Sequence, residues 1–317
     1  RAAAAATAHQ PAITLDGKRL EVVANIGSLA DAEKALSLGA EGVGLLRSEF
    51  LYLSRATAPS EAEQADAYSA ILAAMGERPV IVRTLDVGGD KPLPYLPLPQ
   101  EENPFLGERG IRVGLNHPAI LRQQLRALLQ AAPAGKLRIM LPMVSSLREL
   151  QLAKQLLQQE QQALGAPAVE LGIMVEVPSA ALMAAQLAPH VDFFSIGTND
   201  LTQYTLAIDR GHPLLAGLAD GLSPAVLRLI DMTVKGAHAH GKWVGVCGGI
   251  ASEAEAVPLL LGLGVDEFSV SVPALAEVKA QLRTLDAAAC QQLATKALAC
   301  DDGLAVRQLV AASQPQS

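Results

Sequence analysis

Short apolar segments alternate with amphipathic segments along most of the chain. Eight near-continuous apolar runs are separated by stretches in which apolar residues recur three and four positions apart. Continuous apolar runs are typical of parallel strands buried on both faces, and the wider spacing is typical of helices that cover a sheet. The predicted strands are 22–27, 42–48, 80–86, 137–143, 171–177, 192–198, 243–249 and 267–272.

The amphipathic segments predict helices between these strands. Several begin at a serine in a capping position, and several end near a glycine. The predicted helices are 29–38, 61–75, 118–131, 146–164, 179–187, 224–240 and 252–261, with closing helices within 287–310. Eight unbroken β/α units predict a (β/α)₈ TIM barrel, and a doubly wound open sheet is the alternative.

The predicted domain organisation is one barrel with short additions at both ends. The alanine-rich start, residues 1–12, is interpreted as the remnant of a linker or helix, and residues 313–317 as a tail. The barrel and its C-terminal helices then span 13–312. Two connections, 87–136 and 199–242, are too long for plain loops, and we expect them at the C-terminal face where barrel enzymes carry their active sites.

Composition excludes some classes of function. Half of the 317 residues are hydrophobic and the mean hydropathy is +0.26, yet no apolar stretch is long enough to predict a membrane span. A net charge of −7 argues against nucleic-acid binding, so an anionic ligand needs locally placed arginines. The three cysteines have no metal-site spacing and fit a reducing cytoplasm.

Polar residues stand at or just after the ends of five predicted strands. They are Arg47, Arg83, Glu176, Asn199, Asp200 and Cys247. In a barrel the carboxyl ends of the strands meet at one mouth, so we expect these side chains to converge there. Charges inside apolar strands are costly to bury unless they are paired or bind something.

The arginines suggest an anion site. A guanidinium grips carboxylate or phosphate through two parallel hydrogen bonds. Arg47 and Arg83, with Arg210 on a nearby connection, are therefore candidates to hold a ligand that carries both groups. The alternative is that Arg47 and Arg83 form internal ion pairs with neighbouring carboxylates, of which Glu49, Asp86 and Glu176 are the candidates.

Two further strand-end features are open to more than one interpretation. Glu176 and Asp200 are hard oxygen donors that suit Mg²⁺, which usually takes one or two protein carboxylates, but the nearby arginines could equally neutralise them. Cys247 lies between small residues, where its thiol could act as a general acid or base or simply pack in the core.

Long motifs around these residues resemble one known family. The chain resembles the phosphoenolpyruvate (PEP)-binding C-terminal domain of enzyme I of the bacterial sugar phosphotransferase system, in register from Asp16 to Leu309. The matching stretches are 44–50, 83–95, 102–107, 174–178, 194–204 and 209–211. The run Cys-Gly-Gly-Ile-Ala at 247–251 is most similar to the enzyme-I module of multiphosphoryl transfer proteins, whereas the stand-alone enzyme usually carries glutamate at the position of Gly249.

The resemblance implies a role for each strand-end residue in a PEP-protein phosphotransferase. PEP would be held by Arg47, Arg83 and Arg210, with contacts from Asn199 and Asp200. The resemblance also implies Mg²⁺ as cofactor.

The metal ligands and the catalytic residue follow from the same resemblance. Glu176 and Asp200 would hold Mg²⁺, and Cys247 would deliver the proton that turns the enolate into pyruvate. Replacement of the usual glutamate by Gly249 leaves the partner of the cysteine open.

The resemblance further implies partners that lie on other parts of a longer protein. No histidine stands in a motif that matches the family's phosphoryl acceptor, so the expected partners are a phosphohistidine domain and an HPr-like carrier domain. A homodimer is also expected. Two alternative functions are a non-catalytic PEP-sensing dimer module and the C-terminal domain of a pyruvate phosphate dikinase or PEP synthase.

Overall fold

Eight parallel strands form a closed barrel in the computed structural model, which describes residues 2–89 and 92–313. Each strand pairs with the next along the chain, and β9 pairs with β2 from Glu267↔Glu21 to Ser271↔Asn25, which closes the ring. The strands are β2 Arg19–Ile26, β3 Val43–Arg47, β4 Pro79–Arg83, β5 Lys136–Leu141, β6 Glu170–Val175, β7 Phe193–Ile196, β8 Trp243–Val246 and β9 Glu267–Ser271. All eight predicted strands are confirmed, and closure rules out the open sheet.

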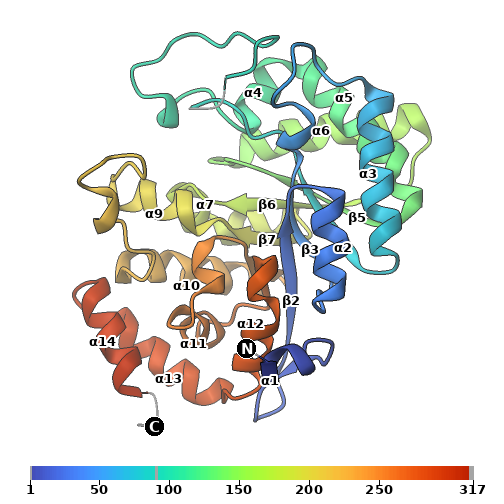
Figure 1. Cartoon of the computed structure of the whole chain (residues 1–317). Coiled ribbons are helices and arrows are strands. Elements are labelled where there is room, and N and C mark those ends of the chain that lie inside the picture. The colour runs from blue at the N-terminus through green and yellow to red at the C-terminus, as the bar shows by residue number, and fades with distance from the viewer. Residues whose placement is uncertain (1, 90–91, 314–317) are drawn as a thin grey trace.

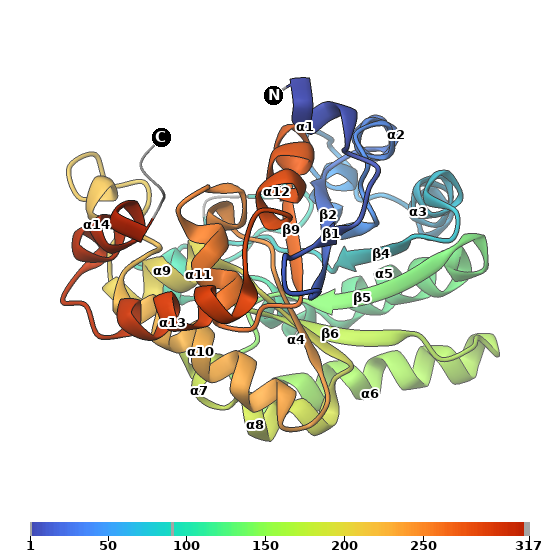
Figure 2. The same ribbon diagram turned by 90° about the horizontal axis from the view of Figure 1, so that it is seen from below.

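Helices surround the barrel, as both ribbon views show (Figures 1 and 2). Serine side chains cap three of them at the predicted positions, and Ser60 forms a reciprocal capping box with Glu63. The helices are α1 Ala2–Ala6, α2 Leu29–Ser37, α3 Glu61–Met75, α4 Ile111–Asn116, α5 Pro118–Ala131, α6 Leu147–Leu164, α7 Pro178–Leu182, α8 Ala184–Leu187, α9 Thr198–Leu206, α10 Pro224–His238, α11 Ala256–Gly262, α12 Leu275–Leu282, α13 Ala287–Leu298 and α14 Gly303–Ser313.

Some predicted elements differ in extent from the observed ones. The single helix predicted over 179–187 is two short helices, because Met183 leaves the helical conformation between α7 and α8. The helix predicted from residue 252 begins at Ala256, after a 3-10 helix, η6 (Gly249–Ser252). The polar segment 199–204, assigned to a connection, lies in α9.

Three other elements were absent from the predictions. α4 and α12 are short, and a two-residue strand β1 (Ala12–Ile13) pairs antiparallel with β2. Such short elements carry too few apolar positions to give a clear period, so tertiary packing decides their structure.

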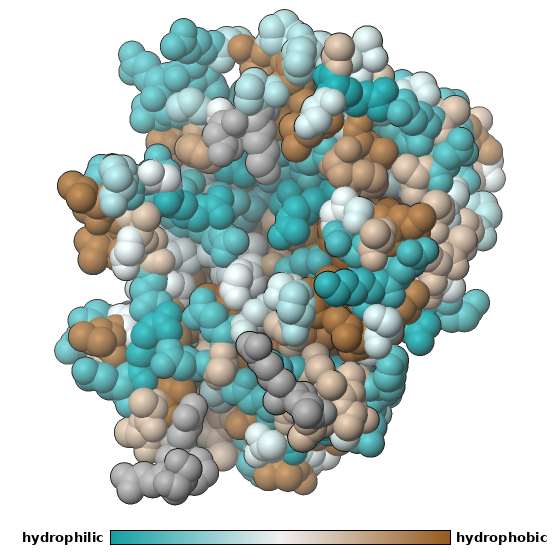
Figure 3. Space-filling view, in the orientation of Figure 1, coloured by the Kyte–Doolittle hydropathy of each residue, from teal (hydrophilic) through white to brown (hydrophobic). Residues whose placement is uncertain are grey.

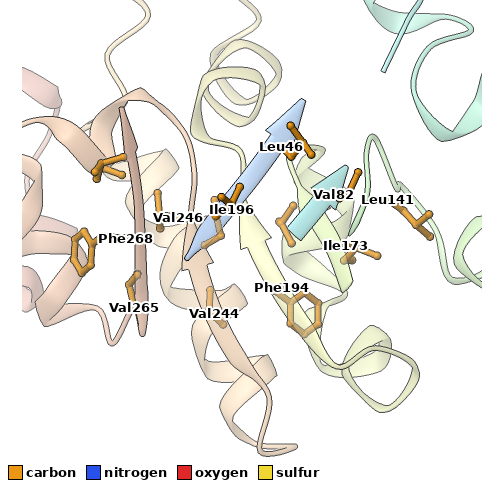
Figure 4. Close-up of a cluster of buried hydrophobic side chains, with 14 of the residues drawn as sticks. Leu46, Val82, Leu141, Ile173, Phe194, Ile196, Val244, Val246, Val265 and Phe268 are labelled. Carbon is orange, nitrogen blue, oxygen red and sulfur yellow. The ribbon is translucent and has the colours of Figure 1, made fainter. Parts of the chain in front are cut away.

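The strand residues divide into two apolar clusters because successive side chains point to opposite sides of the barrel wall. The larger cluster joins the outer face of the strands to the helices, and Figure 4 shows its members on neighbouring strands. The smaller cluster fills the lumen and consists of Leu45, Ile81, Met140, Met174, Phe193 and Cys247, with Trp243 packed against them. The lumen is therefore a packed core below any site at the mouth.

The amino-terminal end of the barrel is occupied by aromatic and charged residues. The rings of Phe193 and Trp243 stack with centroids 4.8 Å apart, and the guanidinium of Arg138 lies 5.2 Å from the Trp243 ring. Glu267, the first residue of β9, is only 2% exposed, and its Oε1 has no hydrogen-bond partner among the described residues. Burial raises the pKa of Glu267 to about 8.

The amino-terminal segment is attached to the barrel by α12. Lys279 is buried, and its Nζ donates hydrogen bonds to the carbonyls of Ala8 (2.9 Å) and Gly39 (2.8 Å). Arg283 donates to Thr7 and Gln10.

The predicted domain boundaries at residues 12 and 313 stay a prediction. Of the expected tail, 313–317, only Ser313 lies within the described residues, and it is the last residue of α14. No helix in 2–89 or 92–313 is long and apolar enough to cross a membrane.

Replacing Glu267 with glutamine should change how stability depends on pH. Because the pKa of this carboxyl rises from about 4.5 in the unfolded chain to about 8 in the folded chain, its stabilising contribution is lost as pH rises through that window. Relative to Glu267→Gln, the wild-type free energy of unfolding should fall at up to about 1.4 kcal/mol per pH unit. Urea unfolding of both proteins from pH 5 to 9 measures this difference, and exposed Glu33→Gln is the control. Parallel pH profiles of wild type and Glu267→Gln would show that Glu267 is ionised in the fold.

Candidate active site

A cavity of about 660 Å³ lies at the carboxyl end of the strands, lined by residues from five of the eight βα units. Hydrophilic side chains gather around the hollow between α9 and α4 (Figure 3). All seven residues predicted for the site line this cavity, namely Arg47, Arg83, Glu176, Asn199, Asp200, Arg210 and Cys247. The seven side chains therefore converge at the barrel mouth, as predicted.

Strand alternation explains why the charged side chains face the cavity. Arg47 follows lumen residue Leu45 by two positions, and Glu176 follows Met174 by two. The same spacing separates Arg83 from Ile81. Residues two apart on a strand share a face, so these groups continue the inward-facing series one step above the apolar lumen.

Arg83 is held by two buried carboxylates. Its Nη2 lies 3.1 Å from Glu49 Oε1, and its Nη1 lies 3.4 Å from Asp86 Oδ2. Burial opposes the charge, but Glu49 and Asp86 outweigh it and raise the pKa of Arg83. The alternative interpretation, internal ion pairs, therefore holds for Arg83, which pairs with Glu49 and Asp86.

The charge of Arg47, unlike that of Arg83, is not balanced by a carboxylate among the described residues. It is the register partner of Arg83 on the adjacent strand, and no carboxylate within the described residues lies within 4.0 Å of its guanidinium. Partial burial and the neighbouring charge of Arg83 lower the pKa of Arg47. Its side chain is exposed to the cavity, so it presents an unpaired positive charge where a bound anion would lie.

A fourth arginine of the cavity was not predicted. Arg109 bridges two carboxylates, with Nη2 3.2 Å from Asp86 Oδ2 and Nη1 3.2 Å from Asp200 Oδ1. The amide of the next residue, Gly110, donates to the carbonyl of Val87, which brings this end of the long connection back to the barrel. The available signal was its position two residues after the 102–107 motif.

Asp200 forms ion pairs with arginines from two different connections. Arg210 Nη2 lies 3.0 Å from the same Oδ1 that Arg109 contacts. Asp200 itself lies in the first turn of α9, where the partial positive charge of a helix start favours a carboxylate. The ion pairs orient both arginines toward the cavity.

Glu176 is a buried carboxylate among like charges. It is 1% exposed, and its Oε1 accepts a hydrogen bond of 2.7 Å from the amide of Met143. Burial and the charges of Asp86 and Asp200 raise the pKa of Glu176 well above its usual value, although Arg83 and Arg109 act in the opposite direction. A cation between these oxygens would relieve that repulsion.

The donor set at this point fits a hard divalent cation. No group of three or more His, Cys, Asp or Glu side chains within residues 2–89 and 92–313 is arranged to enclose a metal ion. Mg²⁺ nevertheless usually takes only one or two carboxylates and completes its octahedron with water and ligand phosphate oxygens. Glu176 and Asp200 are the carboxylates at the cavity that could hold it.

Cys247 lies at the floor of the cavity and is 4% exposed. Burial raises the pKa of its thiol to about 11, so the sulfur carries its proton at neutral pH. The backbone is fixed from β2, two strands away, because Asn25 Nδ2 donates to the Cys247 carbonyl (3.0 Å) and Asn25 Oδ1 accepts from Ser269 of the intervening strand β9 (2.6 Å). Asn25 was not predicted, since its contact with Cys247 exists only once β9 pairs with both β2 and β8 and closes the barrel.

The two glycines after the cysteine bring its loop against α9. A Cβ at Gly248 would lie 1.8 Å from Thr198 Oγ1, so no larger residue fits. The amide of Gly249 donates to Asn199 Oδ1 (3.1 Å), which leaves the Asn199 amide nitrogen as its donor toward the cavity.

Other candidate residues are remote from the cavity. His238 pairs with Asp266 at 2.7 Å near the opposite end of the barrel. Cys290 and Cys300 are free thiols in the C-terminal helical region and do not line the cavity.

Comparison with known proteins agrees with this geometry. Residues 1–287 match the family described as "PEP-utilising enzyme, PEP-binding domain". The chain is 55% identical to a multiphosphoryl transfer protein of Rhodobacter capsulatus over 95% of its length, and 49% identical to a phosphoenolpyruvate-protein phosphotransferase of Staphylococcus carnosus over 94%. It spans 36% and 53%, respectively, of the length of these relatives.

A solved structure supports the fold alone. A citrate lyase from Burkholderia xenovorans LB400 superposes with a TM-score of 0.54 at 18% identity, covering 94% of this chain and 90% of the other. The barrel, the polar cavity at its mouth and the match over residues 1–287 lead to one assignment: the chain belongs to the family of PEP-binding domains of PEP-utilising enzymes.

Proposed function

We propose that the cavity binds PEP together with Mg²⁺ and donates its phosphoryl group to a histidine on another domain. The observation that carries this proposal is the arrangement of charge at the barrel mouth. Arg83, Arg109 and Arg210 are paired with carboxylates, whereas Arg47, beside Arg83, has no carboxylate partner among the described residues. A small ligand with both a carboxylate and a phosphate satisfies such a set of guanidinium groups.

Each cavity residue then has a role in binding. Arg47 and Arg83 approach the ligand from adjacent strands, and Arg210 approaches from the connection after α9. The amide nitrogen of Asn199 and the helix start that carries Asp200 supply further contacts. Together they orient the phosphoryl group toward the open side of the cavity, where an acceptor can reach it.

Glu176 and Asp200 are the proposed ligands of Mg²⁺. When bound, Mg²⁺ would neutralise charge on the phosphate oxygens, which is a main source of catalysis in phosphoryl transfer. The buried position of Glu176 among carboxylates supports this assignment, because a nearby cation would stabilise its charged form.

Cys247 is the proposed proton donor. Cleavage of the bond between phosphorus and the bridging oxygen leaves the electron pair on oxygen and produces the enolate of pyruvate. The carbon atom at the far end of the enolate then takes the thiol proton to become the methyl group. A thiol with a pKa of about 11 is protonated when the enolate forms, which suits a donor.

The whole reaction needs parts outside this chain. Because the chain spans a third to a half of the relatives it matches, we propose that the phosphohistidine domain and an HPr-like carrier domain belong to the rest of a longer protein that serves sugar uptake. We also propose a homodimer that works in the cytoplasm, where the three free thiols stay reduced.

PEP binding should require a divalent metal. Calorimetric titration of the chain with PEP in Mg²⁺ should give at least about tenfold higher affinity than titration in chelator, because the phosphate otherwise meets Glu176 and Asp200 without a cation. Glu176→Gln should remove most of that difference while the fold is retained. Equal affinity with and without metal would refute the metal assignment.

Replacing Cys247 with alanine should separate turnover from binding. In an assay with an added phosphohistidine domain, pyruvate formation should fall by about 10² to 10⁴-fold, while PEP affinity should change by less than about threefold. Cys290→Ala, a buried thiol away from the cavity, is the matched control. Unchanged pyruvate formation would remove Cys247 from the mechanism.

The paired and unpaired arginines should differ in their effect on stability. Without ligand, Arg83→Met should lower the free energy of unfolding by about 3 kcal/mol, because Glu49 and Asp86 each lose their ion pair with Arg83. Arg47→Met should leave stability equal or raise it by about 1 kcal/mol, because it removes a like charge beside Arg83. Both should weaken PEP binding by more than about tenfold. Denaturant unfolding and calorimetry measure the two effects, and equal losses of stability would show that Arg47 is paired.

A further inference from the structure

The last helix, α14, lies beyond the part of the chain that matches the family, which ends at residue 287. It sits beside the connection that follows α9, as the view from below shows (Figure 2). Its first residue, Gly303, is close to Asp220 of that connection, because a Cβ there would lie 2.6 Å from Asp220 Oδ2. The C-terminal helix is therefore in contact with a segment that belongs to the mouth of the barrel.

Arg307 on α14 contacts three carboxylates from two different connections. Its Nε and Nη2 lie 2.9 and 2.8 Å from the two oxygens of Asp220, which is a bidentate ion pair. Its Nη2 lies 3.4 Å from Glu253, and its Nη1 contacts Glu255.

The two connections carry groups of the active site. Asp220 lies in the connection 207–223, which holds Arg210. Glu253 and Glu255 lie in the segment that follows Cys247 after β8. The connections also touch directly, since a Cβ at Gly221 would lie 2.7 Å from Cγ2 of Ile250.

Electrostatics makes Arg307 necessary for this arrangement. Three carboxylates would repel one another if they converged without a cation, and the repulsion would separate the connections. The Arg307 guanidinium lowers the pKa of Asp220, which shows that the pair favours the charged form. Because the Arg307 side chain is 32% exposed, salt screens part of the effect.

We propose that Arg307 is a positioning residue that holds the connection carrying Arg210 against the segment following Cys247. In this view α14 supports the active site, although it lies beyond residue 287, where the family match ends, and its side chains do not line the cavity. Its consequence for catalysis rests on the proposed function, whereas the coupling of the two connections does not.

Hydrogen–deuterium exchange of the ligand-free chain tests the coupling. Arg307→Gln should accelerate exchange about tenfold in both 209–223 and 247–255, with little change in the strands. Arg307→Lys should give an intermediate effect, because it keeps the charge but loses the bidentate geometry. The control is Arg228→Gln, because among the described residues the Arg228 guanidinium donates only to the Leu298 carbonyl at the end of α13. Wild-type protein in about 1 M salt should show faster exchange in the same two segments.

The catalytic consequence is read from PEP titration and turnover. Arg307→Gln should weaken PEP binding about five- to tenfold through Arg210, and lower kcat further through Cys247. Acceleration in only one segment, in neither, or equally across the barrel would overturn the proposal. If exchange changes as expected but wild-type chain does not bind PEP, the coupling stands and the proposed function fails.

Discussion

Charge balance in a cavity partly removed from water is the constraint on which the site depends. Four arginines and four carboxylates line the barrel mouth, and isolated charges there would be too costly to bury. Most are used to neutralise one another, which holds the side chains in fixed orientations before any ligand arrives. Within the part of the chain that the structure describes, the balance is incomplete at Arg47, which has no carboxylate partner, and at Glu176, which lies among like charges. The proposed ligand, an anion that also chelates a metal, would complete the balance at both points.

The barrel provides this constraint through strand alternation. The residues that fill the lumen and those that line the cavity belong to the same inward-facing series, so the apolar floor and the charged mouth are positioned together. Residues far apart in sequence then share one network. Asn25 on β2 fixes the carbonyl of Cys247, and Arg109 joins a loop after β4 to α9 after β7.

The sequence predicted the strands and the seven cavity residues because these depend on local patterns. Continuous apolar runs gave the strands, and a charge at the end of such a run is conspicuous wherever it falls. Arg109 was missed because it follows a long proline-containing connection, where no period relates it to a strand. Asn25 and Arg307 were missed because their roles depend on contacts across more than 50 positions of the chain, which only the closed fold defines. Glu49 and Asp86 were considered only as possible ion-pair partners, and that is the part they play.

The stacked rings of Phe193 and Trp243 have a consequence for the order of events during turnover. They fill the lumen at its amino-terminal end, whereas the cavity lies at the carboxyl end of the strands. Under the proposed function, PEP and the acceptor domain both reach the cavity from this same end. A domain docked there would cover the path by which pyruvate leaves, so product release would follow the departure of that domain.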